Sequence, residues 1–149
     1  MKNYLNIQKV MLGDKFFITY HIESVASRCR VPRFILQPLI ENAITHGIEE
    51  SNAVGIIKIT AEIYDGKLYI NVYDNGKGIN EKEIKQILLS DTMANEKVSN
   101  SFGIRSVLMR IKTLYGSSYG MQINSSPNTG TQCILKLPAT LVYNEGIDV

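Results

Sequence analysis

The sequence predicts a two-layer α/β (α+β) sandwich, in which helices cover one face of a mixed, mostly antiparallel sheet. Short segments rich in β-branched and aromatic residues alternate between polar and apolar positions, as strands do. Between them lie segments whose apolar residues recur at helical spacing. The order along the chain is helix, strand, helix, strand pair, helix, loop, helix and strand pair, and this order favours one continuous domain.

The composition narrows the class of protein. The chain has 149 residues, of which 44% are hydrophobic and 20% charged, which is typical of a globular domain with its own core. The net charge of +2 comes from interspersed signs, so we expect no nucleic-acid partner. No apolar run approaches the roughly 20 residues of a membrane helix, and we expect a cytoplasmic domain. Cys29 and Cys133 lack metal-site spacing, which favours reduced thiols over a disulfide.

The first elements are two helices with a strand between them. Residues 3–12 form a short amphipathic segment that ends before a glycine, and residues 16–22 have the composition of a strand. Pro32 then begins a helical pattern that ends at Gly47. Pro38 removes a helix hydrogen bond, so we expect the regular helix to begin close to it.

The second half begins with a hairpin. Strands at 56–63 and 68–73 flank the turn pair Asp65-Gly66, and a helix over 80–89 follows, with Asn80 as its N-cap.

The remaining segments are a loop, a helix and a second strand pair. Residues 90–102 have no periodicity, and so long a loop in a compact domain is usually functional or disordered. An amphipathic helix runs from Gly103 to the residue before Gly116, and strands are predicted at about 120–125 and 131–137.

Polar residues share one face of the helix that ends at Gly47. Asn42 and His46 lie one turn apart, beside Glu41 and Thr45 and opposite the apolar stripe. An amide oxygen suits Mg²⁺, and an imidazole can donate to a phosphate. Taken alone, the pattern favours an ordinary solvent-exposed face with a histidine near a helix C-terminus.

A second group of residues follows the strand at 68–73. Asp74 is placed to accept a hydrogen bond from the amino group of adenine, and Gly76 and Gly78 allow a close backbone approach to a flat ring. A simple connecting turn has the same composition. The chain contains neither a P-loop nor a Rossmann fingerprint.

The third group leads into the last helix. Small residues at 99–101 precede Gly103 at a helix N-terminus, where free N–H groups favour phosphate. An ordinary N-cap made by Asn100 or Ser101 would look the same.

Taken in order, these segments resemble the N, G1 and G2 boxes and the final Gly-Thr of the GHKL ATP-binding domains. The matching segments are Leu36–Ile48, Asp74–Ile79, Gly103–Gly116 and Gly130–Thr131. The first of them looks like the N box of the LytS/YesM-type sensor histidine kinases. The resemblance implies a Bergerat fold that binds ATP and Mg²⁺ between the N-box helix and a lid, here residues 90–102.

The resemblance also assigns roles to residues. Asn42 becomes the Mg²⁺ ligand, and Asp74 becomes the residue that reads adenine. The other implied nucleotide-binding residues lie beside these two along the same boxes: Glu41, His46, Gly76, Gly78, Ile79, Gly103, Ile104 and Thr131.

The sequence departs from the family pattern at several positions. Pro38 stands where gyrase and the heat-shock-90 chaperones carry a catalytic glutamate, so fast ATP hydrolysis is not expected. Thr45 stands where many histidine kinases have lysine, and Ser99 and Ser101 stand where glycines are usual in the G2 box.

The phosphoacceptor histidine of such a kinase has no match here, because His21 lies in a predicted strand and His46 in the nucleotide site. We therefore expect residues 1–13 to be the tail of a linker helix and residues 14–149 to be the ATP-binding domain of a longer membrane receptor. The implied partners are the phosphoacceptor helical domain of the same kinase, a second copy in a homodimer and a response regulator.

Other readings remain open at this point. A free-standing anti-sigma-factor-type GHKL kinase would suit the length, although its members carry an acidic residue where Pro38 stands. A non-enzymatic interaction module with a degenerate nucleotide site would suit the altered G2 box.

Overall fold

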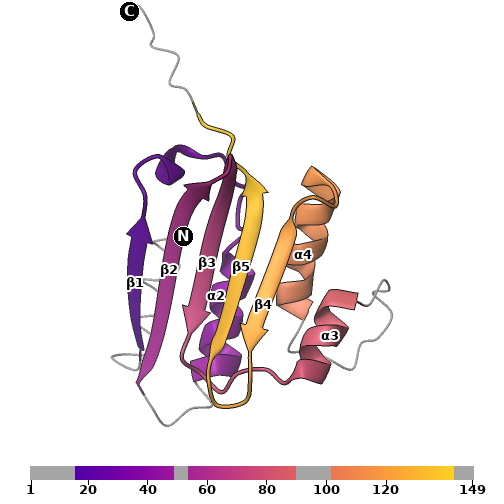
Figure 1. Ribbon diagram of the computed structural model, residues 1–149. Coiled ribbons are helices and arrows are strands. Elements are labelled where there is room, and N and C mark those ends of the chain that lie inside the picture. Colours follow the sequence, from indigo (N-terminus) through magenta and orange to yellow (C-terminus); the bar gives the residue numbers. More distant parts are fainter. Residues whose placement is uncertain (1–15, 49–53, 90–101, 143–149) are drawn as a thin grey trace, which may run out of the picture.

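A single mixed sheet forms the first layer of the molecule (Figure 1). The computed structural model describes residues 16–48, 54–89 and 102–142. The strand order is β1-β2-β3-β5-β4, with β1 parallel to β2 and every other pair antiparallel. The strands are β1 (Phe16–Ile22), β2 (Gly55–Tyr64), β3 (Lys67–Asp74), β4 (Gly120–Ser125) and β5 (Thr131–Pro138). The predicted sheet class is therefore confirmed.

Helices form the second layer. The helical elements are η2 (Ala26–Arg28), α2 (Gln37–Asn42), its continuation η3 (Ala43–Ile48), α3 (Glu81–Leu89) and α4 (Phe102–Tyr115). Helices α2 and α4 pack on one face of the sheet, and α3 lies beside α4 near one end of β4 (Figure 1). The predicted helix at 3–12, the proposed tail at 1–13 and all but the last residue of the loop at 90–102 lie outside the described residues.

The core lies between these two layers. Residues alternate between buried and half-exposed along β3 and β5, as expected for strands with one covered face. The fully buried side chains come from both layers: Ile40, Ile57, Ile59, Leu68, Ile104, Ile111, Leu135 and Leu137. Their burial from water is the main force that holds the helices on the sheet.

The long helix of the N-terminal half begins as predicted but ends differently. Regular helix starts at Gln37, and Pro38 lies in its first turn, where the missing N–H costs no hydrogen bond. Gly47 was expected to end the helix. Instead the chain stays helical through Ile48, with the wider π-helical spacing from Ala43 onward.

The local turn and cap signals are present in the structure. The hairpin turn places Asp65 and Gly66 at φ 49° and 68°, which matches the two positive angles of a type I′ turn. At the start of α3 the Glu83 N–H donates to Asn80 Oδ1 at 3.0 Å, and the Asn80 N–H donates to Glu83 Oε2 at 3.3 Å. This reciprocal capping box fixes the first turn of α3.

Two further features concern expectations from composition. Both cysteines are free thiols, and Cys133 is buried in the core. Within residues 16–48, 54–89 and 102–142, none of the helices has the length and apolar character that a bilayer span requires.

Candidate functional site

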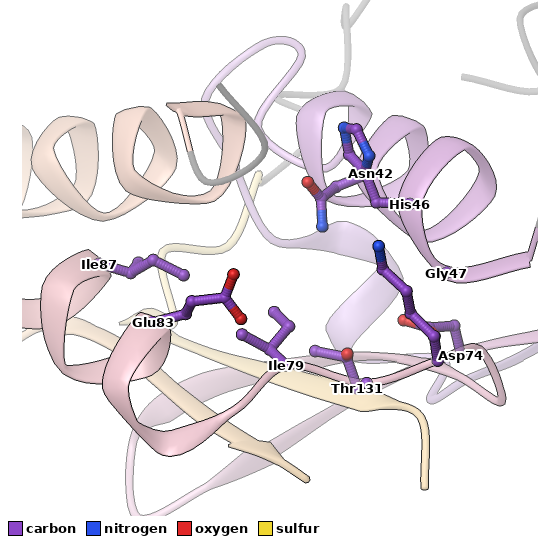
Figure 2. A pocket seen from close by; sticks show the side chains of 10 residues that line it. Asn42, His46, Gly47, Asp74, Ile79, Glu83, Ile87 and Thr131 are labelled. Carbon is purple, nitrogen blue, oxygen red and sulfur yellow. The ribbon is translucent and has the colours of Figure 1, made fainter. Parts of the chain in front are cut away.

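A pocket opens at the end of the sheet where β3 ends and β5 begins (Figure 2). Its walls come from the α2–η3 helix, from the last residue of β3 and the loop after it, from α3 and from the first residue of β5. The lining residues are Asn42, His46, Gly47, Asp74, Lys77, Gly78, Ile79, Glu83, Ile87 and Thr131. The empty space between its walls measures about 540 Å³, part of which is open to solvent.

Asp74 is the buried carboxylate of this pocket, with 5% of its surface exposed. The Gly76 N–H donates to its Oδ1 at 2.9 Å, and the backbone of Thr131 donates a second hydrogen bond. Burial raises the pKa of the Asp74 carboxyl to about 6, and the two backbone donors act against that rise. The group therefore remains mostly ionised at neutral pH and can accept a further hydrogen bond from a ligand.

Asn42 and His46 form the facing wall. They lie one turn apart on the α2–η3 helix, and both line the cavity opposite Asp74 and Thr131 (Figure 2). Thr45, which directly precedes His46, is exposed and does not line the pocket.

The helix and the loop after β3 touch through two glycines. A Cβ on Gly76 would collide with the backbone of Gly47, and a Cβ on Gly47 would lie 2.8 Å from Asp74 Oδ1. The Lys77 N–H also donates to the Gly47 carbonyl at 3.1 Å. Only glycine at both positions lets the helix sit this close to the buried carboxylate.

Asn75 anchors the same loop to the neighbouring strand. Its Oδ1 accepts from the Ile56 N–H at 2.6 Å, and its Nδ2 donates to the Val54 carbonyl at 3.1 Å. Asn75 therefore points away from the pocket and holds the loop in place.

The structure brings six of the sequence-predicted residues together around the cavity: Asn42, His46, Asp74, Gly78, Ile79 and Thr131. Four others do not line it. Glu41 accepts a hydrogen bond from Gln37 Nε2 at 2.8 Å, and the Gly76 N–H donates a hydrogen bond to the Asp74 carboxylate. Gly103 packs against Pro38, and Ile104 is buried in the core. Direct nucleotide contact by these four remains a prediction.

Four lining residues were not predicted: Gly47, Lys77, Glu83 and Ile87. Glu83 and Ile87 are four residues apart and share one face of the predicted helix, but the sequence does not indicate that this face meets the pocket. Figure 2 shows Glu83 and Ile87 on α3, beside Ile79, bordering the cavity.

A family model and curated relatives match this chain. The model described as "Histidine kinase-, DNA gyrase B-, and HSP90-like ATPase" matches residues 31–141. The sensor histidine kinase YpdA of Escherichia coli K12 is 33% identical over 93% of this chain, and YesM of Bacillus subtilis 168 is 28% identical over 93%. The chain spans 23% of the length of each of these two relatives.

Solved structures share the fold. The catalytic domain of histidine kinase ThkA superposes with a TM-score of 0.65 at 19% identity, covering 92% of this chain and 89% of that domain. Full-length ShkA in complex with AMPPNP gives 0.66 at 14% identity, over 95% of this chain and 29% of that one. The matched family model covers the N-box helix, the pocket and the final strands, and the chain belongs to the histidine kinase-, DNA gyrase B- and HSP90-like ATPase family.

Proposed function

We propose that this chain is the ATP-binding catalytic domain of a sensor histidine kinase, which presents Mg-ATP for phosphoryl transfer to a histidine outside the chain. The observation that carries this proposal is the pairing of a buried acceptor, Asp74, with a polar helix face, Asn42 and His46, across one pocket. This arrangement suits a ligand that has hydrogen-bond donors at one end and anionic oxygens at the other.

The Asp74 end of the pocket suits adenine. A buried carboxylate accepts a hydrogen bond from the exocyclic amino group of adenine, whereas guanine presents a carbonyl oxygen at the same position. Two acceptors facing each other repel, so the pocket is expected to prefer ATP to GTP. The apolar side chains of Ile79 and Ile87 border the same cavity and can pack on a flat ring.

The Asn42 end suits a metal-bound triphosphate. Among the described residues, no group of three or more His, Cys, Asp or Glu side chains could hold a metal ion. A Mg²⁺ at Asn42 would therefore take its other ligands from phosphate oxygens and water, as Mg²⁺ often does. The metal would neutralise charge on the phosphates, and we propose that His46 donates a hydrogen bond to them.

The chemistry favours transfer over hydrolysis. One turn before Asn42 the helix carries Pro38, which has no carboxylate to orient a water molecule. A nucleophile must then come from elsewhere, and we propose the phosphoacceptor helical domain of the same kinase. A homodimeric receptor with its catalytic domain in the cytoplasm and a response regulator downstream would complete this assignment.

Two substitutions test the assignment by calorimetry with Mg-ATP. Asp74→Asn should abolish measurable binding, because an amide offers one acceptor oxygen in place of two. Asn42→Ala should remove the part of the affinity that depends on Mg²⁺ and leave the binding of nucleotide in EDTA unchanged.

Lys136→Ala, a substitution on β5 away from the pocket, provides the control and should bind like the parent. If either the Asp74 or the Asn42 variant binds Mg-ATP with the parent affinity, the residue assignment is wrong.

A further inference from the structure

Ser125, the last residue of β4, holds together the backbone around the base-recognising end of the pocket without lining it. Its Oγ lies 2.8 Å from the Ile79 amide nitrogen, 2.6 Å from the Gly130 carbonyl oxygen and 3.2 Å from Thr131 Oγ1. A serine hydroxyl has one proton to donate and two lone pairs to accept with. These three neighbours therefore use its whole hydrogen-bonding capacity.

The direction of each hydrogen bond follows from the chemistry of the neighbours. The Ile79 N–H can only donate, so it takes one lone pair of Ser125 Oγ. The Gly130 carbonyl can only accept, and two oxygens 2.6 Å apart require a proton between them, so Ser125 gives its proton there. The contact with Thr131 then has one possible direction, in which the threonine hydroxyl donates and Ser125 accepts.

This direction decides what Thr131 can offer a ligand. Thr131 is 7% exposed, lines the pocket and is the cross-strand partner of Asp74 (Figure 2). Because its hydroxyl proton is turned toward Ser125, only oxygen lone pairs are left to face the cavity. The ionised Asp74 carboxylate beside it is also an acceptor only.

We propose that Ser125 is a positioning residue for base selectivity, because it orients the Thr131 hydroxyl so that this end of the pocket presents acceptors alone. This inference rests on the proposed nucleotide site and deepens it. A 6-amino purine, or a water molecule bound to it, can donate to both side chains. A 6-oxo purine would place a carbonyl oxygen against two acceptors. Without Ser125 the threonine hydroxyl can rotate and donate to that oxygen.

The experiment compares the dissociation constants of Mg-ATP and Mg-ITP, which carry a 6-amino and a 6-oxo group. Ser125→Ala should lower the ratio of the ITP to the ATP constant by roughly two- to tenfold, the usual effect of one hydrogen bond. Thr131→Val, which removes the hydroxyl and keeps the shape, should lower the same ratio. In the Thr131→Val background, Ser125→Ala should change the ratio no further, because its effect on the base passes through the threonine proton.

Ser126→Ala is the matched control. Its hydroxyl lies in the adjoining turn, 2.8 Å from Thr129 Oγ1, and its side chain does not line the pocket, so the ratio should stay at the parent value. If Ser125→Ala weakens ATP and ITP by the same factor, or changes the ratio equally in both backgrounds, Ser125 only supports the loop and the inference fails while the nucleotide site stands. If the parent chain binds neither nucleotide, the proposed function fails and the inference fails with it.

Discussion

The burial of the Asp74 carboxylate favours ligand binding but disfavours the stability of the folded chain. Its burial beside the core raises the cost of the charged form, which the raised pKa of about 6 expresses. The same burial strengthens any hydrogen bond that a ligand donates to it, because little water competes. A site that recognises a base through a buried charge is thus expected to reduce the stability of the ligand-free chain at neutral pH.

We predict a pH-dependent difference in stability between the parent and Asp74→Asn. The folded carboxyl binds its proton more tightly than the unfolded one, whose pKa is near 3.8, so its contribution is greatest at low pH and is lost as the pH rises through about 6. Between about pH 4 and pH 7, the free energy of unfolding of the parent should fall relative to the variant by about 2–3 kcal/mol.

Chemical denaturation of both chains at a series of pH values measures this difference. A parallel pH profile for the two proteins would show that the carboxyl titrates at its ordinary pKa and is more hydrated than the structure indicates.

Site residues were predictable to the extent that their identity alone suggested a chemistry. Asp74 and Asn42 lie in short sequence motifs that follow one another in a recognisable order, and both residues line the pocket. Ser125 gave no signal, because its role comes from three neighbours brought together by the meeting of β4, β5 and the loop after β3. Glu83 required knowledge of which face α3 turns toward the cavity, and that depends on tertiary packing.

At the scale of elements, the contact between the N-box helix and the end of β3 shapes the pocket. Gly47 and Gly76 let the two backbones meet, and the Lys77 N–H closes the contact by donating to the Gly47 carbonyl. The π-helical spacing of η3 covers this same stretch of the chain. Such local widening often accompanies a functional site.

A pair of helical glycines tests how closely this contact is packed. Gly47→Ala would place a methyl group 2.8 Å from Asp74 Oδ1, so we predict a loss of about 1–3 kcal/mol in the free energy of unfolding, as for other overpacked sites. Gly103→Ala would place its methyl 3.5 Å from Pro38, an ordinary contact, and should leave stability unchanged or raise it by up to about 1 kcal/mol.

Thermal or denaturant unfolding of the two variants gives the comparison directly. Equal effects of the two substitutions would mean that the helix can move away from β3 at little cost.

The elements themselves were largely predictable because alternation and helical periodicity are local properties. The strands and the helices α3 and α4 begin and end close to the predicted residues. Gly47 was read as a helix end because glycine usually ends helices. In the structure a glycine is needed at this position because the end of β3 packs against it, and the local sequence does not reveal that contact.

At the scale of the whole molecule, the sequence predicted the class of sheet but not the order of its strands. The crossover from β1 through α2 to β2 makes that pair parallel, whereas the short connections between β2 and β3 and between β4 and β5 make those pairs antiparallel. The placement of β5 between β3 and β4 follows from tertiary packing, and it brings Thr131 beside Asp74.

We predict that this chain alone shows negligible autophosphorylation with radiolabelled Mg-ATP. The histidine at the pocket, His46, lies on the helix wall of the proposed nucleotide site, and His21 is on β1, away from the pocket lining. Addition of a phosphoacceptor helical domain from the same kinase should yield an acid-labile, base-stable phosphohistidine on that domain. A stable phosphohistidine on this chain itself would contradict the division of labour proposed here.

The pairing of Asp74 with Thr131 across β3 and β5 has a consequence for how the chain reaches its native state. Side chains alternate between the two faces of a strand, so a slip of one residue between these strands would turn one of the two partners to the opposite face of the sheet. A misaligned sheet would then lack the proposed base-recognising end altogether. Nucleotide is thus expected to bind only correctly aligned molecules and to shift a mixed population toward them by mass action.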